Sequence, residues 1–248
     1  MDQPEPTPPD ASPFRPLVLV PGFWMGAWAW DVVVDRLEQA GADATPITLP
    51  GLESADVTRG DIGLADHIDH VLGVIEQFEE PVVLVAHSGA AAVASGVADA
   101  RPDALARIVY VDAAPVADGQ AILPDTPPDA EEIPLPSFDD LVAMGNSIDG
   151  LDEAARRTFT DLAVAEPAGA ARDPLVVTDP ARLDVPVTVI CTSWPVAAVR
   201  EAMAAGVPYV AEVARVADLR LVDLPTGHWP MLSKPAELAE ILLAEARR

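Results

Sequence analysis

The sequence predicts an α/β fold in which a doubly wound, mostly parallel sheet carries an inserted helical cap. Largely apolar runs occur at residues 17–20, 82–86, 107–111 and 187–192, as in strands that are buried on both faces. Segments with the apolar spacing of helices separate these runs, which favours parallel strands joined by right-handed crossovers. Residues 113–182 break this alternation with many prolines and acidic residues. We expect them to form the cap, over the carboxyl ends of the strands, where such sheets bind ligands.

The elements of the first half follow from local start and stop signals. A strand over 17–20 ends at Pro21-Gly22, and Gly41 closes a helix over 27–40. After these we expect a strand over 45–49, a helix over 64–78, a strand over 82–86, a helix over 89–100 and a strand over 107–111.

The second half contains the cap and the end of the sheet. We expect cap helices over 138–144 and 151–163, then a strand over 187–192, a helical region over 196–217 and a strand over 220–224. The final helix has Pro235 in its first turn and Leu238, Ile241 and Leu242 on its buried side.

Composition limits the range of partners. The chain has 15 Lys and Arg against 40 Asp and Glu, a formal charge of −25, which argues against binding to nucleic acid or to a membrane surface. Cys191 is the single cysteine, so we expect no internal disulfide, and no Cys/His cluster indicates a metal site. Residues 1–16 are Pro-rich and lack the apolar core of a signal peptide. We therefore expect a disordered tail over 1–16, one domain over 17–248 and a cytoplasmic protein, with the oligomeric state open.

Ser88 lies where the strand over 82–86 must turn into the next helix. The residues two before and two after it are Ala86 and Ala90, a variant of the Gly-x-Ser-x-Gly turn that exposes a nucleophilic serine. A helix N-terminus beside the hydroxyl favours developing negative charge. An N-cap serine would also fit this position, so the motif alone leaves both interpretations open.

A serine nucleophile needs a base, and the chain has four histidines. We expect His67 and His70 to lie on the surface of their helix, and His87 to have a structural role because its side chain points away from Ser88. His228 follows the last strand in a loop with Pro225 and Gly227. That position places an imidazole at the edge of the sheet where Ser88 emerges, so His228 is the candidate base.

With these residues in view, the chain resembles the α/β-hydrolase superfamily over about residues 15–248. The segments LVLVPGFWMGAWAW, PITLPGLES and GHWPMLSKPAEL resemble those of plant methyl esterases and hydroxynitrile lyases. The resemblance implies an oxyanion hole made by the backbone N–H groups of Phe23 and Gly89, which would stabilise a tetrahedral intermediate.

The carboxylate of a Ser-His-Asp triad is where this sequence departs from its relatives. They often carry it just after the strand over 187–192, where this chain has Ser193-Trp194-Pro195. Asp112 ends the preceding strand and keeps the order serine, acid, histidine, so it is the first candidate. A turn-capping aspartate is the alternative for Asp112, and Glu201, Asp218 and Asp223 are further candidates for the acid.

The combined pattern indicates a cofactor-free serine hydrolase acting on a carboxylic ester of a small, hydrophobic substrate. Trp24, Trp194 and Trp229 flank the expected site loops, which suggests an aromatic-lined substrate pocket or simply cap packing. Two alternatives stay open: an idle or slow ligand-binding member of the fold, and a hydroxynitrile lyase. The lyase is disfavoured because relatives with that activity have threonine at the position of Gly22 and lysine at that of Trp229. Lactones, thioesters and amides share the chemistry of esters and are open as substrates.

Overall fold

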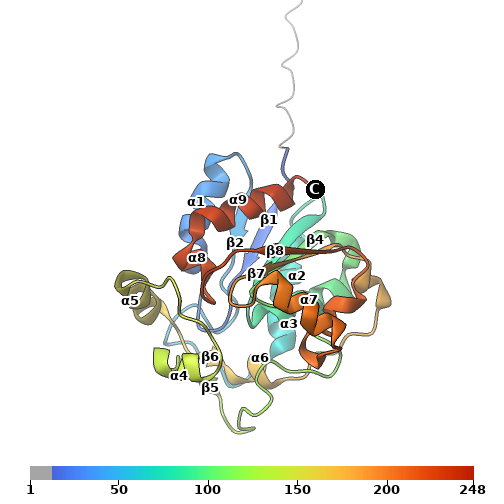
Figure 1. The fold of residues 1–248 in the computed structure, drawn as a ribbon. Helices are drawn as coiled ribbons and strands as arrows, with labels where there is room; N and C mark the ends of the chain where they lie inside the picture. The colour runs from blue at the N-terminus through green and yellow to red at the C-terminus, as the bar shows by residue number, and fades with distance from the viewer. Residues whose placement is uncertain (1–12) are drawn as a thin grey trace, which may run out of the picture.

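The computed structural model describes residues 13–248, and its centre is a parallel sheet (Figure 1). Six strands of the described residues form it in the order β2-β1-β3-β4-β7-β8. These strands are β2 (Ala44–Pro46), β1 (Leu17–Val20), β3 (Val82–His87), β4 (Leu105–Val111), β7 (Val187–Cys191) and β8 (Leu219–Asp223). All neighbouring pairs are parallel, which confirms the predicted fold class.

Helices cover both faces of the sheet. One face carries α1 (Asp31–Gln39) and α9 (Pro235–Ala246), and the other carries α2 (Leu64–Ile75), α3 (Ala90–Ala100) and α7 (Val196–Ala204). The alternation of side chains along each strand decides the partners: Leu17 and Leu19 join the core with α1 and α9, while Val18 and Val20 join the other. The four residues of β1 are therefore all apolar, because both of its faces are buried.

The chain between β4 and β7 forms the cap. It contains β5 (Glu132–Ile133), α4 (Phe138–Ala143), α5 (Glu153–Leu162), β6 (Glu166–Pro167) and α6 (Ala168–Arg172). β5 and β6 pair antiparallel in a small sheet of their own. Figure 1 shows this region at the end of the molecule where the strands finish, opposite the point where the N-terminal segment enters the sheet.

Several predicted elements are shorter than expected or are divided. The strand predicted over 45–49 is β2, which ends at Pro46 because proline has no N–H for the ladder. The helix predicted over 27–40 divides into a 3₁₀ turn, Ala27–Trp30, followed by α1. The region predicted over 196–217 is α7 followed by the 3₁₀ turns Pro208–Val210 and Val213–Arg215. A four-residue helix, α8 (Pro230–Ser233), comes before α9.

The prediction that His67 lies on the surface is wrong. Its side chain is buried, and its Nε2–H donates to the Pro50 carbonyl at 2.9 Å. The loop after β2 folds over this end of α2, which the helical spacing of α2 alone does not reveal. Burial lowers the pKa of His67, so its neutral form is favoured. His70 is exposed, as predicted.

Most of the predicted tail, residues 1–12, lies outside the described residues. Phe14, however, is buried in the core between the sheet and α9, and the Arg15 N–H donates to the Ala246 carbonyl at 2.8 Å. The packed chain thus begins before Leu17. None of the described helices is long and apolar enough to cross a membrane, and the cytoplasmic location stays a prediction.

Candidate active site

Ser88 occupies a strained turn between β3 and α3. Its φ is 52°, a left-handed conformation that costs a residue with a side chain about 1–3 kcal/mol. The Ser88 N–H donates to the Val111 carbonyl at 3.3 Å, and its own carbonyl accepts from Ala91 at 2.9 Å. A methyl group added at Gly22 would lie 2.9 Å from Ser88 Cβ. The crowding explains why small residues surround the serine, and the turn directs its hydroxyl out of the sheet.

The loop after β8 carries His228 and is held by the cap. The His228 N–H donates to the Ser147 carbonyl at 2.7 Å, and the Gly227 N–H donates to the Asp149 carbonyl at 2.9 Å. A Cβ at Gly227 would lie 2.5 Å from that same carbonyl oxygen, so the cap segment can approach this closely only because residue 227 is glycine. The cap therefore fixes the position of the imidazole.

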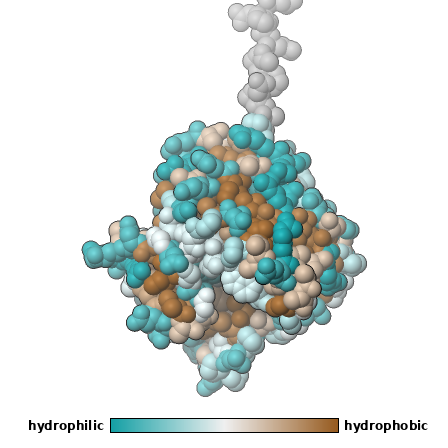
Figure 2. All heavy atoms as spheres, viewed as in Figure 1, coloured by the Kyte–Doolittle hydropathy of each residue, from teal (hydrophilic) through white to brown (hydrophobic). Residues whose placement is uncertain are grey.

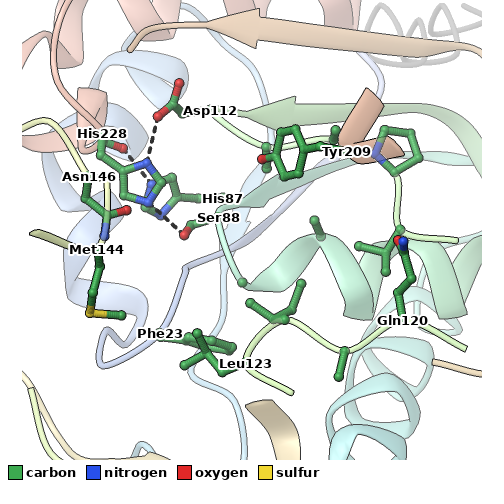
Figure 3. A pocket seen from close by; sticks show the side chains of 18 of the residues that line it. Phe23, His87, Ser88, Asp112, Gln120, Leu123, Met144, Asn146, Tyr209 and His228 are labelled. Atoms are coloured by element: carbon green, nitrogen blue, oxygen red, sulfur yellow. Dashed lines mark hydrogen bonds and ion pairs between the residues drawn. The ribbon is translucent and has the colours of Figure 1, made fainter. Parts of the chain in front are cut away.

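Ser88, His228 and Asp112 form one hydrogen-bonded chain at the carboxyl edge of the sheet (Figure 3). His228 Nε2 lies 2.7 Å from Ser88 Oγ, and Nδ1 lies 2.7 Å from Asp112 Oδ2. The carboxylate can only accept, so Nδ1 carries a proton and the neutral ring presents an unprotonated Nε2 to the serine hydroxyl. Such an imidazole can take the hydroxyl proton.

Asp112 is tied to the end of β7 as well as to the histidine. Its Oδ1 accepts the backbone N–H groups of Thr192 (3.2 Å) and Ser193 (3.0 Å), and its Oδ2 accepts the Ser193 hydroxyl at 2.8 Å. Burial on its own would raise the pKa of Asp112, but the hydrogen bond and charge of His228 and these three donors outweigh it, so the pKa falls well below its usual range. Asp112 is therefore ionised at neutral pH.

The other candidates for the triad carboxylate have different partners or positions. Glu201 is on the exposed side of α7, and Asp218 pairs with Arg107 at 3.6 Å. Asp223 accepts the backbone N–H of Val196 at 2.7 Å and so caps α7. The carboxylate on His228 Nδ1 is that of Asp112.

His87 lies beneath the same imidazole. The two histidine rings are 4.8 Å apart, and the His87 Nε2–H donates to the His228 backbone carbonyl at 2.7 Å. Complete burial, and next the neighbouring charge of His228, lower the pKa of His87 to about 3. It is neutral at physiological pH, and its bond to the loop fits the structural role expected of it.

Phe23 and Gly89 line the cavity beside the serine. Within residues 13–248, neither amide has a hydrogen-bond partner. The two residues are in close contact, because a Cβ at Gly89 would lie 2.5 Å from the Phe23 ring. Two donors without partners beside a hydroxyl can receive a negatively charged oxygen.

A cavity of about 650 Å³ opens at Ser88, and Figure 2 shows a hollow with hydrophobic residues around it at the cap end of the molecule. Trp24 and Trp229 line it and are themselves buried. Its far side is formed by Gln120, Leu123 and their neighbours in the segment that follows β4 (Figure 3). Among residues 13–248, the ionisable side chains that line it are those of the two histidines, Asp112 and Tyr209. The rest of the lining that the structure describes is made of uncharged residues, most of them apolar.

Trp194, which the sequence also suggests for the substrate pocket, does not line the cavity at Ser88. It is 47% exposed and lines a second cavity of about 450 Å³, with Tyr209 edge-on to it at 6.1 Å. Both cavities share Asp112, Asn146 and His228 among their lining residues, so they adjoin at the histidine.

Sequence reasoning missed the residues that support the site. The sequence pattern gives Ser193 no role, yet its hydroxyl and its backbone N–H both donate to Asp112. Ser193 follows β7, the strand next to β4, so the sheet order places it beside Asp112. This position is the signal from which its role could be predicted. Trp24 has a φ of 66°, and with Ser88 and Asp112 (45°) it makes up the non-glycine residues with positive φ among those described. No feature of the linear sequence indicates the backbone conformation of Trp24.

Comparison with known families assigns the fold. A model of the alpha/beta hydrolase family matches residues 17–241. The chain belongs to the alpha/beta hydrolase family. The match spans the sheet, the cap and the loop that carries His228, so the family covers every part of the site.

Two curated relatives match part of the chain. A carbendazim hydrolyzing esterase of Nocardioides sp. (strain SG-4G) is 37% identical over 98 residues, which are 39% of this chain and 40% of that protein. Putative methylesterase 13 of Arabidopsis thaliana, described as chloroplastic, is 33% identical over 118 residues, 46% of this chain and 26% of that protein. The chain thus matches less than half of the length of either relative.

Solved structures of the family match nearly the whole chain. An extracellular alpha/beta-hydrolase from a Paenibacillus species has a TM-score of 0.73 at 21% identity, covering 94% of this chain and 98% of its own. Methylesterase MES16 from Arabidopsis has a TM-score of 0.72 at 18% identity, covering 92% and 97%. At these identities the likeness shows the fold, which agrees with the resemblance to plant methyl esterases.

Proposed function

We propose that the chain is a serine hydrolase that cleaves a carboxylic ester of a small, uncharged and largely apolar substrate, using only its own side chains and amides. One observation carries the proposal: Ser88, His228 and Asp112 form an unbroken hydrogen-bonded chain with 2.7 Å at each histidine nitrogen. The esterase and methylesterase names of the relatives support the same reaction class.

The first half of the reaction forms an acyl-enzyme. Ser88 Oγ attacks the ester carbonyl carbon while His228 Nε2 takes the hydroxyl proton. The carbonyl oxygen becomes an oxyanion that accepts hydrogen bonds from the Phe23 and Gly89 amides. Asp112 stabilises the imidazolium through its bond to Nδ1. The C–O bond to the alcohol then breaks, and His228 passes its proton to the leaving oxygen.

The second half restores the enzyme. Water takes the place of the alcohol, and His228 removes its proton as it attacks the acyl carbon. The second tetrahedral intermediate collapses, the bond to Ser88 Oγ breaks, and His228 returns the proton to the serine. Protons and electron pairs balance over the cycle, with ester and water consumed and acid and alcohol released.

The lining of the cavities supports the substrate class. The carboxylate of Asp112 is engaged by four donors, and the formal charge of the chain is −25. An anionic substrate would meet no lysine or arginine among the described residues that line the larger cavity. An apolar acyl or alcohol group would instead be buried against aromatic and aliphatic side chains.

The lyase alternative loses support from the space around Gly22. A Cβ at that position would lie 2.7 Å from His87 Nδ1 and 2.9 Å from Ser88 Cβ. A threonine there, as in plant hydroxynitrile lyases, would need a different arrangement of the serine turn. Trp229 is buried at the position after the histidine and offers only an indole N–H where those enzymes have a lysine.

A series of p-nitrophenyl esters from acetate to dodecanoate tests the function. We expect wild-type turnover with a preference for an apolar acyl group, and at least a thousandfold lower kcat in Ser88→Ala, in the range of triad serine losses. Ser54→Ala, on an exposed loop, is the matched control and should retain full activity. If the protein binds one of these esters tightly but hydrolyses none of them, it is instead a ligand-binding member of the fold without catalytic activity.

A further inference from the structure

The buried carboxyl group of Glu166 has no part in the proton transfers described above, yet it lies against the loop that follows β1. Glu166 is in β6 of the cap and is 1% exposed. Its Oε2 accepts the Trp24 backbone N–H at 2.9 Å, across 142 residues of sequence. Its Oε1 has no partner among the described residues. A buried polar atom without a partner is costly, so the position calls for an explanation.

Trp24 is held by the cap on three sides. Besides the bond to Glu166, its carbonyl accepts the Val164 N–H at 3.0 Å, and its indole N–H donates to the Ile133 carbonyl at 2.9 Å. The N–H, the carbonyl and the side chain of Trp24 are therefore tied to β6, to Val164 between α5 and β6, and to β5, in that order. A single residue of the core domain thus receives three cap contacts.

These contacts act on a turn that is strained. The Met25 N–H donates to the Gly22 carbonyl at 3.3 Å, which closes a four-residue turn with Trp24 at its third position. A positive φ there is typical of type II turns, which favour glycine at this place. Type I and type II turns differ mainly in the orientation of the middle peptide, here the one between Phe23 and Trp24. Glu166 accepts the N–H of that same peptide.

The amide proposed as an oxyanion donor belongs to the second residue of this turn. The peptide that carries the Phe23 N–H and the peptide held by Glu166 meet at the Phe23 Cα. The Phe23 ring contacts Gly89, which carries the other donor, and packs edge-on against Trp24 at 5.9 Å. A rotation of the middle peptide would relieve the strain at Trp24 and displace Phe23 relative to Gly89.

From this geometry we infer that Glu166 is a positioning residue of the cap, which holds the oxyanion hole in place through the Trp24 amide. The inference rests on the proposed ester hydrolysis. The role needs an acceptor oxygen at this place and no negative charge. Burial raises the pKa of Glu166 to about 8, against the opposing effects of the Trp24 N–H and the Arg59 guanidinium, so at neutral pH the group is mainly the uncharged acid.

Two substitutions of Glu166 distinguish the effect of its acceptor oxygen from the effect of its size and shape. Glu166→Gln keeps an oxygen that can accept the Trp24 N–H, and its NH₂ group replaces the acid O–H. Glu166→Met keeps the length of the side chain and removes the acceptor. Glu153→Met, on a cap side chain that is 90% exposed, is the matched control for a methionine on the cap.

The experiment measures kcat and KM with a p-nitrophenyl ester and the inhibition constant of an alkyl trifluoromethyl ketone. That ketone forms a tetrahedral adduct with an active-site serine, and its oxyanion occupies the same hole. In Glu166→Met we expect kcat to fall by about tenfold to a hundredfold, part of the 10²–10³ that loss of one oxyanion donor costs. The inhibition constant should rise by the same factor, while KM stays within about threefold. Glu166→Gln and Glu153→Met should match wild type within about threefold.

A merely structural role would lower the melting temperature of Glu166→Met without changing kcat or the inhibition constant of the folded protein, and this result would overturn the inference. Equal losses in Glu166→Gln and Glu166→Met would also overturn it, since the acceptor would then not be the reason. If Glu166→Met does not fold, Glu166→Asp takes its place. Its shorter side chain places the oxygen too far from the Trp24 N–H, so kcat should fall while KM stays within about threefold. Failure of the proposed function looks different: Ser88→Ala would then be as active as wild type.

Discussion

Replacing Asp112 by asparagine tests how the site sets the proton on His228. Asp112 Oδ1 accepts two backbone N–H groups, from Thr192 and Ser193, whereas Oδ2 faces the Ser193 hydroxyl and His228 Nδ1. The asparagine oxygen must therefore stay at the Oδ1 position, and its NH₂ group must face His228. An NH₂ group donates to Nδ1, so the ring proton moves to Nε2, where it faces Ser88 Oγ and the ring can no longer act as a base.

The size of the effect follows from this change of tautomer. In a triad of the same design, the equivalent substitution lowers kcat by about 10⁴, or about 5.5 kcal/mol of transition-state stabilisation. The folded state should lose much less, because the two backbone N–H groups keep their acceptor and the Ser193 hydroxyl can rotate to accept from the new NH₂. We expect an unfolding free energy within about 2 kcal/mol of wild type.

The assay is kcat with p-nitrophenyl butyrate at pH 7.5, with urea unfolding of the same preparations. Asp223→Asn is the matched control, because Asp223 also lies at a strand end, that of β8, and accepts a backbone N–H at the start of α7; it should keep kcat within about threefold. A kcat above one tenth of wild type in Asp112→Asn would refute the reasoning, and so would a large loss in Asp223→Asn with Asp112→Asn unaffected.

Three further predictions concern crowding, titration and a buried ion pair. Gly22→Ala places a Cβ 2.7 Å from His87 Nδ1, so both the melting temperature and kcat should fall, the unfolding free energy by about 1–3 kcal/mol; unchanged values would contradict the packing. Glu166 has a pKa of about 8 when folded and about 4.3 when unfolded, so its contribution to stability is full below about pH 4.3 and is lost as the pH rises toward 8. Glu166→Gln does not titrate, and urea unfolding should show its stability relative to wild type rising between pH 5 and pH 8.5; parallel curves would contradict the shift. Arg107→Met removes the most buried of the arginines that pair with the buried Glu245, at 3.4 Å, while Arg220 stays at 3.2 Å, and should lower the unfolding free energy by about 1–3 kcal/mol with kcat unchanged; a loss below about 0.5 kcal/mol would show that Arg107 is dispensable.

The sheet could be predicted because burial on both faces leaves a direct trace in the sequence. Strands β3 and β4 are apolar at nearly every position, and their flanking helices have clear spacing. The small residues of α3 likewise indicate close packing against its neighbours. The structure shows this packing, since a Cβ at Gly96 would lie 2.3 Å from the Ile68 side chain of α2. Local sequence is therefore enough to predict an element when the same cause, here burial, acts on most of its residues.

The candidate site could be located because chain topology brings distant strand ends to one edge. Ser88, Asp112 and His228 each follow a parallel strand, so the sequence order and the sheet together place them near one another. What the sequence does not encode locally are contacts across the cap. The bond of Glu166 to Trp24 spans 142 residues, and the burial of His67 depends on a loop from another part of the chain. Such contacts follow from the tertiary arrangement of loops, for which the sequence has no periodic signal.

Labelling with a fluorophosphonate, followed by peptide mass mapping, tests the central claim most directly. The reagent phosphonylates a serine only when a neighbouring base activates its hydroxyl. We expect one adduct per chain, on Ser88, in wild type and in His70→Ala, whose histidine is exposed, and no adduct in His228→Ala. An unlabelled Ser88 in the folded wild-type protein, or equal labelling in His228→Ala, would contradict the account.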